Sequence, residues 1–112
     1  MPYLRVETNV ELQAERRKAL LNLLSTRLAE TLGKPEAYMM VQLSSGVDLA
    51  FAGSLEPAAY VELKSIGLAE TQQLSRFICG LLQSELGVSP QRIYIEFIDI
   101  PPKYWGWNNS TF

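Results

Sequence analysis

The sequence predicts one α+β domain, a two-layer α/β sandwich in which two helices cover one face of a four-stranded mixed sheet. Two stretches carry apolar residues at the three- and four-residue spacing of a single helical face. Four other stretches are rich in β-branched and aromatic residues. These segments follow one another as strand, helix, strand and then strand, helix, strand. Since 112 residues suffice for one hydrophobic core, we expect residues 1–112 to form a single domain.

The first half opens with a strand predicted over Tyr3–Thr8. A helix over about residues 12–32 follows, and Gly33 and Pro35 end it, because glycine adopts the left-handed terminal conformation and proline cannot continue a helix. The second strand is predicted over residues 38–43. The helix prediction depends on a leucine stripe at helical spacing, formed by Leu20, Leu23, Leu24, Leu28 and Leu32.

The second half repeats this order. Strands are predicted over residues 59–66 and 92–100, with a helix between them that Gly87 and Pro90 end. The repeated order and stop signals favour two βαβ halves related by an internal pseudo-two-fold repeat, joined by an irregular connection around residues 44–54. The second helix shows an apolar face formed by Leu74, Phe77, Ile78, Leu81, Leu82 and Leu86.

The composition excludes several classes of function. Apolar residues make up 47% of the chain and charged residues 20%, which argues against disorder. Ten basic against 12 acidic residues, with a pI near 5.1, leave no basic footprint for a nucleic acid. No apolar run is long enough for a transmembrane helix, and the first residues lack a secretory signal. We expect a cytoplasmic protein with neither nucleic acid nor membrane as its partner, although leaderless secretion remains compatible with the sequence.

Two apolar stretches predict an oligomer. Met39-Met40-Val41 and residues 93–98 are apolar on both alternating faces, which indicates burial on both sides of the sheet. Two helices cover only one face of a four-stranded sheet. Because most soluble oligomers consist of identical chains, further copies of the same chain are the economical cover for the second face.

The absence of histidine restricts the chemistry further. With no histidine and one cysteine, Cys79, the chain has no internal disulfide and no Ser-His or Cys-His nucleophile pair. A Cys/His metal site is disfavoured for the same reason. We interpret Cys79 as a buried thiol on an apolar helix face, and Met39 and Met40 as core residues.

Pro2 is the candidate base. Removal of Met1 would leave its nitrogen as a secondary amine, and an α-amino group titrates near 7.7–8.0 when unperturbed. Burial or a nearby cation lowers that pKa and produces a general base, or a nucleophile toward carbonyls, near neutral pH. The alternative is that Pro2 merely begins an edge strand, where a missing N–H is harmless. With Met1 retained, the nitrogen is a tertiary amide without a basic lone pair.

Lys34 and the carboxyl-terminal segment are the other candidates. Lys34 lies between Gly33 and Pro35, where it either binds an anionic substrate or complements the dipole of the preceding helix. The segment 101–112 carries four aromatic side chains within its last nine residues. These side chains either line an apolar pocket or fix the carboxyl terminus across a subunit boundary.

Together these motifs strongly resemble the macrophage migration inhibitory factor family over essentially the whole chain, with D-dopachrome tautomerase as a more distant relative. The closing block is the most specific of the motifs. They are Met1-Pro2, Gly33-Lys34-Pro35, Phe51-Ala52-Gly53-Ser54, Glu56-Pro57, Ser65-Ile66-Gly67, Cys79-Gly80-Leu81-Leu82, Ser89-Pro90, Arg92-Ile93-Tyr94-Ile95 and Gly106-Trp107-Asn108-Asn109-Ser110-Thr111-Phe112.

The resemblance implies a homotrimer of β-α-β-β-α-β subunits around a central channel, with one site at each subunit boundary. It also implies a cofactor-free phenylpyruvate tautomerase-type isomerase, in which Pro2 moves a proton between the enol and the carbon α to the carbonyl. Lys34 and the Ile66 N–H would hold the substrate carboxylate, with Ser65 beside it. The aromatic wall would comprise Tyr38, Trp107 and Phe112, with Tyr94 supplied by the neighbouring subunit.

The chain departs from the family pattern at three places. Ala58-Ala59-Tyr60-Val61 replaces a Cys-x-x-Cys motif, so thiol–disulfide oxidoreductase activity is not supported. Glu96 stands where the mammalian pattern has Asn near the substrate ring, and a carboxylate there would raise the pKa of the Pro2 amine or repel an anionic substrate. Tyr3 and Trp105 replace smaller or more flexible residues, which would narrow or reshape the pocket.

Two functions from different classes follow from the resemblance. The first is the tautomerase, acting on an aromatic α-keto acid of the phenylpyruvate or dopachrome type. The second is a cytokine-like signalling or interaction protein with a weak or vestigial pocket, since animal members of the family have cytokine activity. The pocket residues favour the tautomerase, whereas a receptor-binding surface cannot be recognised in one sequence.

Overall fold

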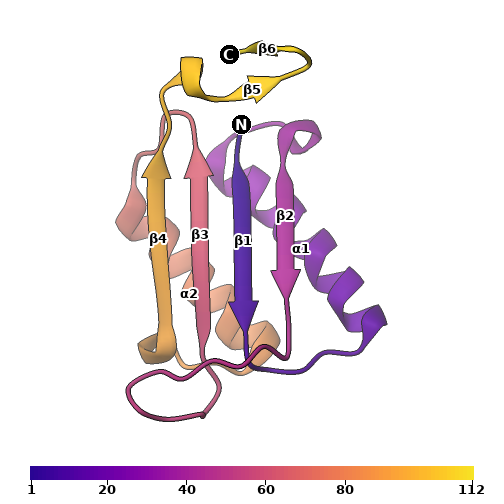
Figure 1. Ribbon diagram of the computed structural model, residues 1–112, viewed down its shortest axis with the longest axis vertical. Coiled ribbons are helices and arrows are strands. Elements are labelled where there is room, and N and C mark those ends of the chain that lie inside the picture. Colours follow the sequence, from indigo (N-terminus) through magenta and orange to yellow (C-terminus); the bar gives the residue numbers. More distant parts are fainter.

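The computed structural model describes all 112 residues and has the predicted order β-α-β-β-α-β, followed by a small hairpin (Figure 1). Four strands form one mixed sheet in the order β2-β1-β3-β4. The two central strands, β1 and β3, are antiparallel, and each outer strand is parallel to its neighbour. The strands are β1 (Tyr3–Thr8), β2 (Met40–Ser44), β3 (Ala59–Ser65) and β4 (Ile93–Asp99).

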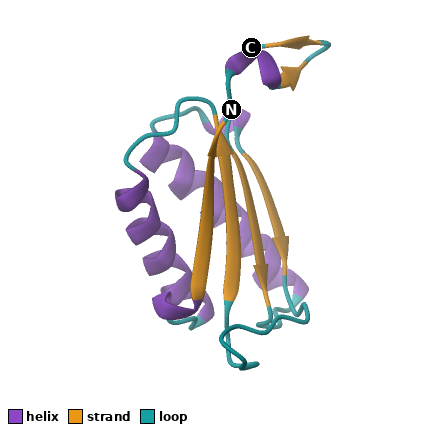
Figure 2. Cartoon of the chain, turned by 60° about the vertical axis from the view of Figure 1, so that its left-hand side comes forward, coloured by secondary structure: helices purple, strands orange, loops and turns teal.

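Two helices form the second layer. Helices α1 (Ala14–Leu32) and α2 (Thr71–Leu86) lie on the same side of the sheet, and no element covers the opposite side (Figure 2). Each helix ends at the predicted glycine, because Gly33 and Gly87 adopt left-handed φ values of 66° and 70°. Neither helix has the length and hydropathy that a membrane span requires.

The hydrophobic core lies between the helices and the sheet. The inward positions of the central strands alternate with outward ones, as a half-buried antiparallel pair requires. The predicted helical stripes supply the other half of the core. Its fully buried members include Leu4, Val6, Val61 and Leu63 from the sheet and Leu20, Leu24, Leu28, Ile78 and Leu82 from the helices.

The boundaries of the parallel strands differ from the prediction. Tyr38 belongs to a short 3-10 helix, η1 (Glu36–Tyr38), and Arg92 to another, η2 (Pro90–Arg92). Prolines at 35 and 90 fix the backbone at the entrance of both turns, and this favours a tight turn before the strand begins. The predicted first residues of these two strands therefore lie just outside the sheet.

The uncovered face is apolar only in part. Within the chain, Met40 is 65% exposed and Tyr94 is 66% exposed. The middle of this face is charged: the Arg5 guanidinium lies 2.8 Å from the Glu62 carboxylate, and the Lys64 ammonium lies 3.7 Å from the same group. The outward positions of the central strands are thus polar, and the sequence pattern of β2 and β4 does not represent the whole face.

The carboxyl-terminal segment crosses the end of the sheet next to the amino terminus (Figure 1). It consists of η3 (Pro102–Tyr104) and a hairpin of β5 (Gly106–Trp107) and β6 (Ser110–Thr111), which the sequence interpretation did not anticipate. Asn108 and Asn109 form the two-residue turn with φ values of 52° and 65°. Asparagine tolerates this left-handed conformation, which suits the twist of a tight hairpin.

Candidate active site

Pro2 lies at the end of the sheet that the carboxyl-terminal segment crosses. Its ring is fully buried, and it continues the alternation that turns Leu4 toward the helices. The Pro2 carbonyl accepts a hydrogen bond of 3.1 Å from the Met40 N–H, which fixes the start of β1 against β2. In the chain as described, with Met1 attached, the Pro2 nitrogen is an amide.

Ser65, Ile66 and Lys34 surround this position. Extending the β1–β3 register by one residue brings Pro2 opposite Ser65, whose hydroxyl is buried without a hydrogen-bond partner. The Lys34 ammonium donates to the Ile66 carbonyl at 3.0 Å, while the Ile66 N–H has no acceptor within the chain. An ammonium, an unpaired N–H and an unpaired hydroxyl thus lie together beside the first strand, a combination that suits a carboxylate.

The electrostatics of the amino terminus favour a neutral amine. Burial, followed by the nearby Lys34 ammonium, lowers the pKa of the Met1 α-amino group below its ordinary value. Both effects penalise the charged form of an amine. Lys34 is half-buried and approaches the amino terminus from the end of α1, so its position depends on the helix stop at Gly33.

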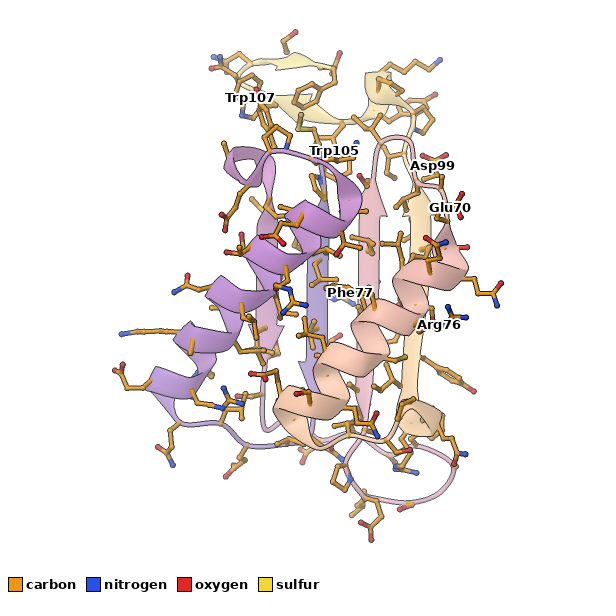
Figure 3. The ribbon with its side chains drawn as sticks, turned by 180° about the vertical axis from the view of Figure 1, so that it is seen from behind. Glu70, Arg76, Phe77, Asp99, Trp105 and Trp107 are labelled. Atoms are coloured by element: carbon orange, nitrogen blue, oxygen red, sulfur yellow. The ribbon has the colours of Figure 1, made fainter.

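Three aromatic rings form a wall over the same end of the sheet. Trp107 and Phe112 stack with their centroids 5.6 Å apart, and Tyr38 meets both edge-on at 5.7 Å and 6.4 Å. Hydrogen bonding of the Phe112 N–H to the Trp105 carbonyl at 3.2 Å holds the hairpin closed. The structure therefore brings these three predicted wall residues together within one chain, at the place where Figure 3 shows Trp107 beyond the strand ends.

Tyr94 lies elsewhere. It pairs with Tyr60 across β3 and β4, and Tyr60 in turn pairs with Glu7, five residues along β1 from Pro2. At about 3.3 Å per residue, this places Tyr94 roughly 17 Å from Pro2 along the strand direction. The ring instead contacts Phe51, with centroids 4.7 Å apart. No single chain unites Tyr94 with the Pro2 end of the sheet.

Glu96 occupies the middle of the uncovered face. It aligns with Glu62 and, through it, with Arg5, so it lies about 10 Å from Pro2 along the strand direction. Glu62 is paired with Arg5 and Lys64, whereas none of the chain's ion pairs includes Glu96. Its exposed carboxylate is therefore available to a neighbouring molecule and does not contact Pro2 of its own chain.

Tyr3 and Trp105 line a cavity of about 500 Å³ on the uncovered face. The Tyr3 hydroxyl donates to the Gln42 side-chain oxygen at 2.6 Å, which holds the ring along the sheet. The sequence interpretation missed the other lining residues, although the strand alternation that exposes Tyr3 also identifies Lys64, its partner in β3. These lining residues are Met40, Gln42, Lys64, Ile100, Tyr104 and Gly106.

Asp99 was also missed by the sequence interpretation. Its carboxylate accepts hydrogen bonds from the N–H groups of Gly67 and Leu68, at 2.9 Å and 3.2 Å. These bonds fix the turn that directly follows Ile66, and Asp99 lies at this end of the sheet in Figure 3. Asp99 ends β4, and only the parallel pairing with Ser65 brings it to that turn.

The groups at this end of the sheet suit acid–base chemistry on an anionic aromatic molecule. The residues combine an amino terminus with a lowered pKa, a cation, hydrogen-bond donors and an aromatic wall. The chain has no group of three or more His, Cys, Asp or Glu side chains placed to hold a metal ion. Cys79 is half-buried on α2, and burial raises the pKa of its thiol.

The comparisons with known proteins agree with the fold. The family model described as Macrophage migration inhibitory factor matches residues 1–112. The chain belongs to this family. Macrophage migration inhibitory factor from Meriones unguiculatus is 39% identical over 115 residues, which cover 100% of this chain and 99% of the relative. The rat protein of the same name is 37% identical over the same length and coverage.

Solved structures of family members confirm the architecture. The macrophage migration inhibitory factor homologue of Prochlorococcus marinus superimposes with a TM-score of 0.91 at 45% identity, covering 98% of both chains. The Trichinella spiralis member gives a TM-score of 0.88 at 30% identity, covering 98% of this chain and 99% of its own. The macrophage migration inhibitory factor fold therefore holds for this chain throughout its length.

Proposed function

We propose that the protein is a cofactor-independent keto–enol tautomerase acting on phenylpyruvate-like aromatic α-keto acids, with Pro2 as the general base. The observation that carries the proposal is the environment of the amino terminus. Burial and Lys34 lower the pKa of the Met1 α-amino group, and the same surroundings would act on the Pro2 amine once Met1 is removed. A base whose pKa lies near the working pH is the most effective. Membership of the macrophage migration inhibitory factor family supports the same chemistry.

The mechanism requires removal of Met1, because only then does Pro2 carry a basic secondary amine. In the ketonisation direction the neutral Pro2 amine takes the enol O–H proton and becomes an ammonium, the double bond shifts from C=C to C=O, and the ammonium returns the proton to the carbon α to the carbonyl. In the reverse direction the neutral amine removes that proton from carbon. The proton inventory balances without a metal, redox partner or cofactor.

The surrounding residues hold the substrate. The Lys34 ammonium and the free N–H of Ile66 bind the carboxylate, with the Ser65 hydroxyl beside it. The rings of Tyr38, Trp107 and Phe112 pack against the aromatic group. Tyr3 and Trp105 shape the cavity on the neighbouring face, and they narrow the space that a substrate can occupy.

The site is completed in a homotrimer, in which Tyr94 and Glu96 come from the neighbouring subunit. The support is geometric: both side chains are exposed on the uncovered face, and Tyr94 lies too far along the sheet to reach Pro2 of its own chain. Copies of the chain would also cover Met40 and the other exposed apolar groups of that face.

The deciding experiment follows phenylpyruvate ketonisation by the wild type and by Pro2→Gly, after mass spectrometry has verified the loss of Met1 from the wild type. Pro2→Gly replaces the secondary amine by a primary amine without the ring that fixes its position, and misplacement of a catalytic group costs about a hundredfold, so kcat/KM should fall by about that factor. Thermal unfolding of both proteins controls for folding. Equal rates in the two proteins would remove Pro2 from the mechanism.

A cytokine-like interaction protein is the second candidate, because curated relatives bear the name macrophage migration inhibitory factor. A wild type that lacks tautomerase activity although Met1 is absent and the trimer is intact would favour this reading.

A further inference from the structure

Arg92 makes an unusual set of contacts just before β4. Its guanidinium has no carboxylate partner and donates instead to four backbone carbonyls. The Nε atom binds the Pro57 oxygen at 2.9 Å and Nη1 binds the Phe51 oxygen at 3.0 Å. Nη2 binds the oxygens of Ser54 and Glu56 at 3.3 Å and 3.0 Å. Four of the five N–H groups of the guanidinium are therefore used to hold one loop.

The loop is shaped around this guanidinium. Phe51 and Ser54 exchange two backbone hydrogen bonds of 3.0 Å across a tight turn, in which Ala52 and Gly53 have φ values of 53° and 72°. Alanine rarely adopts such a conformation, so surrounding contacts have to maintain it. The Arg92 guanidinium supplies them and also lies 5.2 Å from the centroid of the Phe51 ring.

Phe51, held by Arg92, in turn contacts Tyr94. The two rings meet edge-on with centroids 4.7 Å apart, although the Tyr94 side chain is 66% exposed. Both rings border an apolar hollow of about 360 Å³ on the uncovered face. An exposed tyrosine has several rotamers available, and the Phe51 edge favours one of them.

We propose that Arg92 is a positioning residue, which orients Tyr94 through Phe51 for contact with the substrate bound by a neighbouring subunit. This inference rests on the tautomerase function proposed above, in which Tyr94 completes that site. Arg92 itself does not contact the substrate. Its role depends on the planar fork of the guanidinium, because a lysine ammonium has three donors and no plane to stack on Phe51.

The test compares Arg92→Gln and Arg92→Lys with the wild type in steady-state phenylpyruvate kinetics. Since Tyr94 contributes to substrate binding, we expect Arg92→Gln to raise KM about tenfold with kcat nearly unchanged. Arg92→Lys should recover only a small part of this loss. Simple damage to the fold would instead lower the active fraction, which reduces kcat and leaves KM unchanged; that pattern would overturn the proposal.

Arg76→Gln provides the matched control, because Arg76 projects from α2 on the helical side of the molecule (Figure 3). Its kinetics should equal those of the wild type. If Arg92→Gln fails to fold, Phe51→Leu removes the ring between Arg92 and Tyr94 while leaving the four hydrogen bonds from the guanidinium to backbone carbonyls in place. We expect it to raise KM to a similar extent, and Phe51→Tyr, which retains the ring, to restore the wild-type value. An unchanged KM in Phe51→Leu contradicts the proposal.

A double-mutant cycle identifies the path of the effect. In a Tyr94→Ala background, Arg92→Gln should produce no further change in KM, because the group that it positions is gone. If the double variant instead shows the product of the two separate increases in KM, Arg92 acts independently of Tyr94, and the proposal is wrong.

A measurement without turnover separates this proposal from the proposed function. Nuclear Overhauser contacts between the Phe51 and Tyr94 rings should be present in the wild type, retained in Arg76→Gln and lost in Arg92→Gln. If the wild type proves inactive, the tautomerase proposal fails while this comparison still decides whether Arg92 orients Tyr94. Retention of the contacts in Arg92→Gln overturns the positioning role in either case.

Discussion

The two ends of the four-stranded sheet both carry aromatic side chains, but they are built in different ways. At the Pro2 end, the rings of Tyr38, Trp107 and Phe112 pack against one another within the chain. At the opposite end, Tyr94 rests on Phe51 alone among the aromatic residues and is mostly exposed.

The Pro2 end therefore holds most of the candidate site, whereas the Tyr94 end holds little of it. The Pro2 end contains the candidate base, a cation, a free N–H and an aromatic wall, so one chain assembles most of the candidate site. The Tyr94 end presents an exposed ring in contact with Phe51, and it lies far from Pro2, Lys34 and Ile66 of its own chain. In the homotrimer proposed above, the two ends would complement each other between chains, and four predictions test that relation, from the largest expected effect to the smallest.

Blocking the Pro2 nitrogen should have the largest effect. A fusion that leaves any residue in front of Pro2 keeps the nitrogen as an amide, so kcat/KM should fall by about a thousandfold or more. Proteolytic release of Pro2 as the first residue should restore activity in the same sample. Full activity of the uncleaved fusion would show that the Pro2 end is not the centre of the chemistry.

Mixing two impaired variants tests whether the sites are shared. In Pro2→Gly the base is a primary amine without the ring that fixes its position, whereas Tyr94→Ala lacks the ring of Tyr94, and we expect the latter to reduce kcat/KM about tenfold. After the two variants are dissociated and reassembled together, some boundaries combine an intact Pro2 with an intact Tyr94. Activity should then exceed the sum of the separate variants. If the activity of the mixture equals the sum of the two separate activities, Tyr94 does not contribute to the site of a neighbouring chain.

Lys34→Gln tests the cation at the Pro2 end. Loss of a charged hydrogen-bond donor to the carboxylate should raise KM about tenfold. The Lys34 ammonium also helps to lower the pKa of the Met1 α-amino group, and we expect the same effect on the Pro2 amine of the processed chain. Its removal makes protonation easier, so the amine pKa rises and the acidic limb of the kcat/KM profile moves to higher pH. Lys18→Gln, on the exposed face of α1, is the matched control and should change neither quantity.

Glu96→Asn should have the smallest effect. If the Glu96 carboxylate approaches Pro2 of a neighbouring chain, it favours the protonated amine and repels an anionic substrate. The variant should then lower KM about twofold to threefold and shift the acidic limb to lower pH. Glu30→Asn, on the outer side of α1, controls for the change in net charge. If neither KM nor the pH of the acidic limb changes, Glu96 does not reduce the activity.

Most of the fold could be predicted from local sequence signals. The apolar stripes of the two helices and their terminal glycines at 33 and 87 depend only on neighbouring residues, and both helices end where expected. The entrances to the parallel strands were less predictable. Tyr38 and Arg92 suit a strand by composition or position, but the prolines at 35 and 90 favour a 3-10 turn through these residues.

The composition of the uncovered face was also hard to predict, for a different reason. Apolar residues at alternate positions of β2 and β4 indicated a second buried side, yet the neighbouring central strands present Arg5, Glu62 and Lys64 there. The pattern of one strand does not reveal the side chains that its neighbours contribute to the same face. Only the strand order combines them.

Some features of the candidate site could likewise be predicted from the sequence, and others could not. The sequence alone determined the candidate base, the absence of imidazole chemistry, the two helix stops and the aromatic composition of the tail, because these features depend on residue type and on neighbours in the chain. Tertiary structure decided that Pro2 lies opposite Ser65, that Lys34 reaches the Ile66 carbonyl, and that Tyr94 lies at the far end of the sheet. Strand order, register and loop path bring together groups distant in sequence, and no local propensity encodes those distances.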